Sequence, residues 1–218
     1  MSKSKLAYEI VPVTPFAQNC SVIWCTKTKL AAVVDPGGEI EKVREVLQEN
    51  QLELDKILIT HAHLDHAGGT AELARATGVP IIGPHKADQF WIDALPEQCL
   101  MFGFEGEIFT PDRWLKHGDQ VSLGELSFDV VHCPGHTPGH VVFVEKSAQF
   151  AAVGDVIFQG SIGRSDFPQG NQEHLISSIR NRLFPIGDAI RFIPGHGPMS
   201  TFGAERRSNA FVADHRFG

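Results

Sequence analysis

Four side chains of the kinds that bind metal ions occur within six residues of this 218-residue sequence, directly after the apolar stretch 56–60. We predict that this stretch is a short buried strand. In the extended chain that follows it, His61 and His63 project to the same side and can hold one ion. Asp65 and His66 come after the chain begins to turn, so they can point toward a second ion. Such a polar run has no packing role in an apolar core, and it therefore predicts a metal site.

The same kind of ending recurs after three further apolar runs, each followed by glycine and then by His136, Asp155 or His196. Glycine lets the backbone turn sharply without steric cost, so these endings can gather side chains at one edge of a sheet. The spacing assigns three imidazoles to one ion, a carboxylate with two imidazoles to the other, and one bridging carboxylate. The two groups are His61, His63 and His136, and Asp65, His66 and His196, with Asp155 as the bridge.

Imidazole and carboxylate donors indicate two divalent ions, which we predict to be zinc, with iron or manganese as alternatives. Paired ions in such sites lie ~3.5–4 Å apart and lower the pKa of a shared water toward neutrality. We therefore expect hydrolysis by a metal-bridging hydroxide held by Asp155. Asp65 is the one candidate for a proton donor to the leaving group, which favours a thioester, because a thiolate with a conjugate acid pKa of about 8–9 leaves without protonation.

The remaining histidines and the cysteines are assigned structural roles. We expect solvated or hydrogen-bonded surface positions for His85, His117, His174 and His215, and supporting positions for His132 and His140, which flank His136. The four cysteines show no CxxC spacing and indicate reduced, buried thiols: Cys20, Cys25, Cys99 and Cys133.

The order of predicted elements indicates one α/β domain over 1–218. Predicted strands cover 8–13, 20–25, 30–35, 56–60, 79–83, 120–123, 125–132, 139–145, 149–153 and 189–193, and predicted helices cover 39–50, 70–77 and 172–183. Segment 84–113 reads as a helix followed by an irregular loop, with aromatic residues that line either a pocket mouth or a dimer contact. Strands followed by helices in each half predict two mixed sheets packed face to face, with helices outside.

Charge and hydropathy narrow the possible partners. The formal net charge is −7 and the basic residues are scattered, so nucleic acid is excluded as a partner and a small molecule is favoured. No apolar run near the N-terminus predicts a signal peptide or a membrane span, so we expect a cytoplasmic protein that does not bind membranes. The sequence leaves a monomer and a small homo-oligomer equally open.

Four motifs together resemble the metallo-β-lactamase superfamily: HxHxDH, Gly-His-Thr-Pro-Gly-His, Gly-Asp after an apolar strand, and Pro-Gly-His-Gly. The resemblance runs from Tyr8 to about Met199 and is greatest to the short, single-domain bacterial branch of glyoxalase II, the hydroxyacylglutathione hydrolases. It implies an αβ/βα four-layer sandwich, a dinuclear metal site and hydrolysis of a thioester such as S-lactoylglutathione.

The resemblance also assigns a substrate contact. By its position Arg164 corresponds to a basic residue that binds a glutathione carboxylate, although a solvated arginine or a pair with Asp166 explains it equally well. Two departures bear on glutathione binding. Larger glyoxalases II have a C-terminal helical domain, which we do not expect after Met199, and aromatic hydroxyl groups near Asp166 and Pro198, whereas the only tyrosine here is Tyr8.

Two other functions remain open. Persulfide dioxygenases of the same fold use one iron held by residues matching His61, His136 and Asp155, and loop 163–167 resembles theirs. Segment 194–198 favours the hydrolase, because dioxygenases place an acidic residue and an aromatic after the histidine. A non-catalytic metal-binding domain is the second alternative, but structural zinc sites are usually closed and cysteine-rich. A secreted β-lactamase is disfavoured by the missing export signal, and a nuclease by the negative charge.

Overall fold

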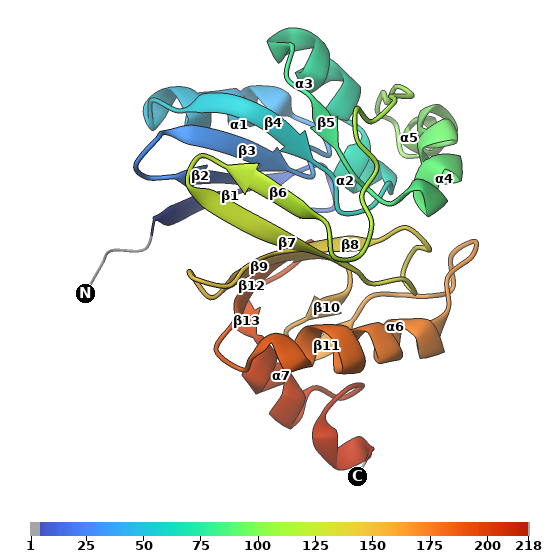
Figure 1. Ribbon diagram of the computed structural model, residues 1–218. Coiled ribbons are helices and arrows are strands. Elements are labelled where there is room, and N and C mark those ends of the chain that lie inside the picture. Colours follow the sequence, from blue (N-terminus) through green and yellow to red (C-terminus); the bar gives the residue numbers. More distant parts are fainter. Residues whose placement is uncertain (1–4, 218) are drawn as a thin grey trace.

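The computed structural model describes residues 5–217 and contains two large β-sheets packed face to face (Figure 1). One sheet has five strands in the order β1-β2-β3-β4-β5, and the other has six in the order β13-β12-β9-β8-β7-β6. Helices α1 and α3 cover the outer face of the first sheet, while α6 and α7 cover the outer face of the second. The predicted αβ/βα sandwich with two mixed sheets is therefore confirmed.

The first sheet combines an antiparallel meander with a parallel half. Strands β1 (Leu6–Val13), β2 (Gln18–Cys25) and β3 (Leu30–Val34) pair antiparallel, whereas β4 (Glu53–Leu58) and β5 (Ile81–Ile82) continue from β3 in parallel. The parallel pairings require crossover helices, and α1 (Ile40–Glu49) and α3 (Thr70–Thr77) supply them. Parallel strands end at the same edge of the sheet, so the chain leaves β3 and β4 at neighbouring points.

The second sheet is mainly an antiparallel meander of β6 (Gln120–Leu123), β7 (Leu126–His132), β8 (Val141–Glu145) and β9 (Phe150–Gly154). Strand β12 (Arg191–Pro194) then pairs parallel to β9, and β13 (Ser200–Thr201) pairs antiparallel to β12. The parallel pair β9 and β12 brings the residues that follow both strands to one edge. A short hairpin of β10 (Ile157–Phe158) and β11 (Ser161–Ile162) follows β9 directly.

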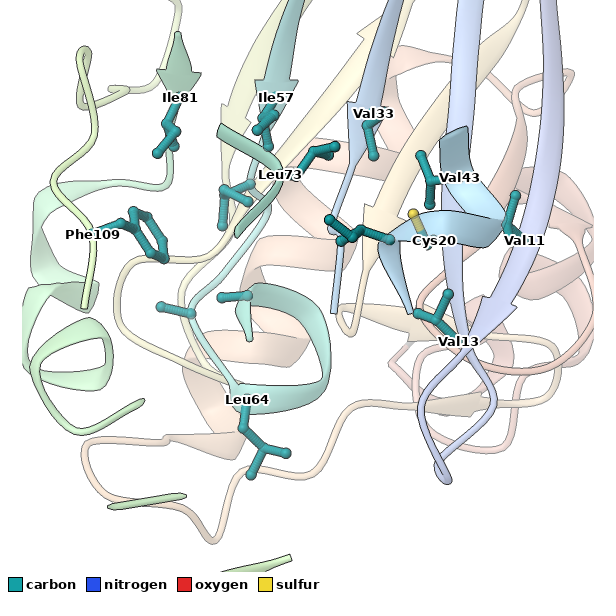
Figure 2. Close-up of a cluster of buried hydrophobic side chains, with 14 of the residues drawn as sticks. Val11, Val13, Cys20, Val33, Val43, Ile57, Leu64, Leu73, Ile81 and Phe109 are labelled. Carbon is teal, nitrogen blue, oxygen red and sulfur yellow. The ribbon is translucent and has the colours of Figure 1, made fainter. Parts of the chain in front are cut away.

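Alternation of side chains along the strands divides the apolar residues into separate buried layers. On β2, Val22 faces the helices α1 and α3, while its neighbour Ile23 faces the space between the two sheets. Figure 2 shows the helix-side layer, where Val43 from α1 packs over Val33 of β3. Full burial of such a side chain contributes ~1.5–3 kcal/mol, so both layers stabilise the sandwich.

Segment 84–113 has the predicted order of helix and then irregular loop. It contains a 3-10 turn (Lys86–Asp88), α4 (Gln89–Asp93) and α5 (Leu95–Met101), after which the chain is irregular up to β6. Together with the short α2 (Leu64–Ala67) these helices lie at the edge of the sandwich where β4 ends. Two of the aromatic residues in the segment are buried, Trp91 and Phe109.

The structure differs from the predicted elements mainly toward the C-terminus. The predicted helix 172–183 consists of α6 (Gln172–Ser178) and a π-helical turn (Ile179–Leu183), followed by a 3-10 turn (Phe184–Ile186). Helix α7 (Phe202–Ser208) and the 3-10 turn Asp214–Arg216 were not predicted, because one apolar anchor in a polar stretch gives no helical period. Among the helices of residues 5–217, none is both long and apolar enough to span a membrane.

Candidate metal centre

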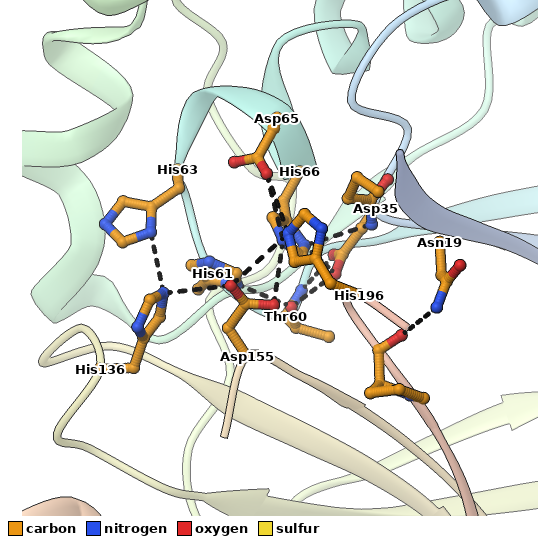
Figure 3. A network of polar contacts seen from close by, with 12 residues as sticks. Asn19, Asp35, Thr60, His61, His63, Asp65, His66, His136, Asp155 and His196 are labelled. Carbon is orange, nitrogen blue, oxygen red and sulfur yellow. Dashed lines mark hydrogen bonds and ion pairs between the residues drawn. The ribbon is translucent and has the colours of Figure 1, made fainter. Parts of the chain in front are cut away.

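The structure brings all seven predicted ligand residues together at one edge of the sandwich (Figure 3). The loop after β4 and the start of α2 carry the first four, and the segments after β7, β9 and β12 carry one each. Six of these residues fall into the two predicted groups, within each of which one possible ligand atom per residue lies within 4.8 Å of the others. The groups are His61, His63 and His136, and Asp65, His66 and His196.

Two rings of the three-histidine group, those of His136 and His61, are held from behind by hydrogen bonds at their outer nitrogens. Nδ1 of His136 donates to the Arg164 carbonyl over 2.7 Å, and Nδ1 of His61 lies 3.0 Å from the Thr60 hydroxyl. On the inner side, Nε2 of His136 and Nδ1 of His63 are 2.9 Å apart. The outer contacts fix the ring orientations and leave inner nitrogens that face one another, as ligands of one ion must.

The second group combines a carboxylate with two imidazoles. Nε2 of His196 lies 3.1 Å from Oδ2 of Asp65, and Nε2 of His66 lies 3.9 Å from the same oxygen. The other nitrogen of His196 donates to the Phe16 carbonyl over 3.2 Å, which orients the ring. This group is less enclosed than the first, since Asp65 and His196 are only partly buried.

Asp155 lies between the two groups. Its Oδ1 is 3.3 Å from Nε2 of His66, while its Oδ2 is 3.6 Å from Nε2 of His136 and 3.7 Å from Nε2 of His196. One carboxylate therefore faces nitrogens of both groups, which is the position that the sequence predicted for a bridging ligand.

The electrostatics of the two groups differ. Burial lowers the pKa of His61 and of His63 well below the usual imidazole value, and neighbouring imidazoles lower it further. Burial also opposes protonation of His66, but the charges of Asp155 and Asp65 raise its pKa well above the usual value. Burial would raise the pKa of Asp155, yet the charge of His66 and the other nearby imidazoles keep it below its usual range. The first group thus offers neutral nitrogens, whereas the second is surrounded by the negative charges of Asp65 and Asp155.

Several atoms of the centre are buried without a hydrogen-bond partner within residues 5–217: His61 Nε2, His63 Nε2, His66 Nε2 and Asp155 Oδ1. The last two are 3.3 Å apart but are not aligned as a hydrogen bond. An unsatisfied buried polar atom costs ~1–3 kcal/mol, so several at one point need an explanation. Imidazole and carboxylate atoms of this kind are donors that suit divalent metal ions, and the residues present therefore fit a metal centre.

Gly195, directly before His196, passes close to the centre. A Cβ at this position would lie 2.0 Å from Oδ1 of Asp155 and 2.5 Å from Cε1 of His66. Contacts that short are not tolerated, so glycine is required for the β12 ending to approach the bridging carboxylate.

Asp35 supports the centre, although its place in an apparent turn after β3 did not predict this role. Its Oδ2 accepts hydrogen bonds from Nδ1 of His66 over 2.9 Å and from the Thr60 hydroxyl over 2.6 Å. Its Oδ1 accepts from the Thr60 amide over 2.7 Å. With its oxygens engaged in this way, Asp35 orients the histidines rather than serving as a ligand itself.

Asp88 is a second supporting carboxylate that was not predicted. It is buried and accepts hydrogen bonds from the Ala62 amide (3.2 Å), the Thr137 hydroxyl (2.8 Å) and the Gly139 amide (2.6 Å). It therefore connects the loop that carries His61 to the loop that carries His136. Burial raises the pKa of Asp88 to about 7, although the three hydrogen bonds oppose the shift.

The other histidines lie behind the centre or at the surface. His140 is buried, its ring stacks on His61 at 4.5 Å, and its Nε2 accepts a hydrogen bond from the Asp155 amide over 3.0 Å. His132 donates to the Pro138 carbonyl and stacks on His85, which also caps the 3-10 turn at Lys86–Asp88. His85 is thus a partly exposed, hydrogen-bonded group, and the remaining three are exposed, as predicted: His117, His174 and His215.

The structure also describes the positions of the four cysteines. All four are buried and unpaired, as the sequence predicted for reduced structural thiols. Cys133 lies three residues before His136 but belongs to the apolar layer beneath α6.

A cavity of about 780 Å³ opens onto both donor groups and is lined by His63, Asp65, His136, Asp155 and His196. Trp91 and Phe102 of segment 84–113 also line it, so part of that segment forms the pocket mouth. Arg164 lines the cavity as well, but its guanidinium pairs with both oxygens of Asp166, at 3.0 and 2.8 Å. Both alternatives for Arg164 thus remain compatible with its position.

Known proteins resemble this chain both in sequence and in structure. The Metallo-beta-lactamase superfamily matches residues 13–198. The hydroxyacylglutathione hydrolase GloC of Haemophilus influenzae is 48% identical over 206 residues, which cover 94% of this chain and 97% of that protein. Among solved structures, the BLEG-1 B3 metallo-beta-lactamase has a TM-score of 0.87 at 32% identity and covers 94% of this chain and 99% of its own. TTHA1623, solved in a di-iron-bound form, has a TM-score of 0.84 at 33% identity, with coverages of 94% and 100%.

Proposed function

The chain belongs to the metallo-beta-lactamase superfamily, and we propose that it is a metal-dependent hydrolase of glutathione thioesters, with S-lactoylglutathione or a related acyl-glutathione as substrate. The observation that carries the proposal is the position of Asp155 between two donor groups at the floor of an open cavity. The 48% identity to a hydroxyacylglutathione hydrolase over nearly the whole chain supports the same substrate class. The protein acts in this proposal as one hydrolase domain, as a monomer or a small homo-oligomer in the cytoplasm.

The metal ligands in this proposal are the seven residues of the two groups and the bridge. His61, His63 and His136 would hold one divalent ion, Asp65, His66 and His196 would hold the other, and Asp155 would be shared between them. We propose zinc, with iron or manganese as alternatives, because the donors are nitrogen and oxygen without thiolate. A relative that is 33% identical binds two irons, which supports the number of ions and keeps iron as an alternative. When bound, such ions activate water and polarise a carbonyl oxygen.

The surrounding residues orient the ligand side chains, keep the bridging carboxylate ionised and can accept a proton. Asp35 and the Arg164 carbonyl hold His66 and His136 through their outer nitrogens, so that the inner nitrogens keep their direction. Asp155, whose pKa is kept low by the neighbouring imidazoles, stays ionised at neutral pH. Asp65 lines the cavity, and its carboxylate can take the proton that is released when water is deprotonated.

The leaving group explains why a thioester suits this site better than an amide. A thiolate departs without protonation, whereas an amide nitrogen must receive a proton as it leaves. Among the described residues that line the cavity, Asp65 is the one acid outside the bridge, and His196 already contacts it at 3.1 Å. The described lining of the cavity therefore offers little free acid to protonate an amine leaving group.

A paired measurement tests the proposal. Purified protein is analysed for bound metal, and S-lactoylglutathione hydrolysis is followed by thiol release, with a β-lactam and glutathione persulfide as comparison substrates. We expect thioester cleavage to be much faster than β-lactam cleavage, without oxygen consumption. Oxygen uptake with the persulfide would identify an oxygenase, and bound metal without turnover of any substrate would identify a non-catalytic metal-binding domain.

A further inference from the structure

The cavity above the metal centre is walled mainly by apolar side chains, and this bears on the acyl group of the substrate. Six of them are Phe16, Trp91, Met101, Phe102, Phe158 and Phe167. Resting on the thioester hydrolase function, we propose that the site selects glutathione thioesters whose acyl group carries a bulky apolar substituent, such as a phenyl ring, over the small lactoyl group.

The inner part of the wall lies beside the reacting centre. The rings of Trp91 and Phe167 contact the His63 ring, with centroids 4.5 and 4.7 Å away. The acyl substituent of a thioester is only a few bonds from its carbonyl carbon. If that carbonyl lies over the two donor groups, the substituent therefore lies near these rings. The glutathione half is a polar tripeptide and gains little from such a surface, whereas an apolar acyl group is stabilised in proportion to the area it buries.

The outer part of the wall is apolar but open to solvent. Phe102, after α5, packs edge to face against Phe16, in the turn between β1 and β2, with ring centroids 5.2 Å apart. Phe16, Met101 and Phe102 are 39%, 80% and 53% exposed. Exposed aromatic groups gathered at a pocket mouth usually mark a binding surface, because covering them releases ordered water.

The charged residues that line the cavity also favour selection through the acyl group. Among the described residues that line it, Arg164 is the one Lys or Arg, and Asp166 already pairs with its guanidinium. The Phe167 ring lies under the same guanidinium at 4.7 Å, so Arg164 extends the aromatic wall. With that cation already paired, apolar contacts to the acyl group are the main source of selectivity that the described lining offers.

The test compares two substrates that differ by one ring. The glutathione thioester of 2-hydroxy-3-phenylpropanoic acid adds only a phenyl group to the lactoyl methyl, and the methylene between them insulates the carbonyl from electronic effects. We expect kcat/KM to be about tenfold higher for the phenyl substrate, chiefly through a lower KM. Equal or lower kcat/KM for the phenyl substrate would overturn the inference.

Two substitutions localise the effect. Phe102→Ala should reduce the preference for the phenyl substrate by roughly fivefold, because it removes part of the outer wall. Leu100→Ala is the matched control, since Leu100 lies in the last turn of α5 two residues before Phe102, is 78% exposed and does not line the cavity. An equal loss of preference in both variants, or a change in oligomeric state confined to Phe102→Ala, would overturn the inference, the latter by identifying the mouth as a contact between copies.

The outcomes separate this inference from the function on which it rests. Metal-dependent hydrolysis of the lactoyl thioester without preference for the phenyl substrate would contradict only the selectivity. Failure to hydrolyse either thioester would contradict the proposed function itself.

Discussion

Nδ1 of His66 donates a hydrogen bond to Oδ2 of Asp35 over 2.9 Å, and this contact joins the metal centre to the end of β3. The same oxygen accepts the hydroxyl proton of Thr60, whose oxygen in turn lies 3.0 Å from Nδ1 of His61. One carboxylate therefore orients a histidine in each donor group. Because β3 and β4 are parallel neighbours, the two strands deliver Asp35 and the histidine loop to the same edge.

We expect Asp35→Asn to weaken metal binding by roughly 10- to 100-fold, because supporting carboxylates fix the ring orientation of ligand histidines. Competition between the protein and a chelator measures the affinity, and thermal unfolding of metal-free protein serves as the control for folding. An Asp35→Asn protein that binds metal as tightly as the wild type would show that the contact does not orient a ligand.

Substitution of Gly195 tests the close approach of β12 to the bridge. Gly195→Ala should lower kcat/KM by at least about 100-fold, because the added Cβ would lie 2.0 Å from Oδ1 of Asp155. Gly197→Ala is the matched control: a Cβ there meets nothing within 4 Å, although its φ of 75° adds backbone strain. Similar losses of activity in both variants would indicate strain, not displacement of the carboxylate.

Helix α7 holds the hairpin β10–β11 that lines the cavity. Buried Glu205 accepts a hydrogen bond from the Gly160 amide over 2.8 Å, and buried Asn209 donates to the Ser161 carbonyl over 2.9 Å. Asn209→Ala should cost ~1–3 kcal/mol of unfolding free energy and raise KM more than it lowers kcat. Ser208→Ala, at an exposed neighbour, should change neither quantity. An unchanged KM in a destabilised Asn209→Ala protein would limit the helix to a structural role.

Asp88 predicts a pH dependence of stability. Burial raises its folded pKa to about 7 from 3.8, so the folded state holds this proton more tightly than the unfolded state does. The resulting stabilisation is present below pH ~4 and is lost as pH rises through about 7. The unfolding free energy of metal-free wild type, relative to Asp88→Asn, should therefore fall by up to ~1.4 kcal/mol per pH unit between pH 5 and 7. Urea unfolding at several pH values measures it, and a difference that is constant or rises with pH would contradict this assignment.

Sequence patterns were sufficient to group the seven predicted ligand residues, because each follows an apolar stretch within a few residues and three of them are directly preceded by glycine. The supporting carboxylates carried no such sign. Asp35 begins an Asp-Pro-Gly-Gly stretch that is indistinguishable from an ordinary turn, and Asp88 lies in a segment without clear periodicity. Their roles depend on contacts with residues more than twenty positions away, as in the pair Asp35 and Thr60.

The large elements of the fold were also predictable from sequence patterns, whereas the shortest strands were not. Alternation of apolar strands with amphipathic stretches such as 39–50 predicted the two covered sheets, and the structure confirms them. Two-residue strands gave no pattern: β10 and β11 form only because the chain turns back directly after Asp155. Such short elements are set by tertiary contacts, here by α7, and not by local propensity.

Titration of metal into chelator-treated protein, with bound ions and S-lactoylglutathione hydrolysis measured on the same samples, tests the central claim most directly. We expect two ions per chain at full activity, hydrolysis that disappears with the metal and returns with it, and loss of one or both ions in Asp155→Ala. Thioester hydrolysis that persists without metal, or a protein that binds no ions at the two donor groups, would contradict it.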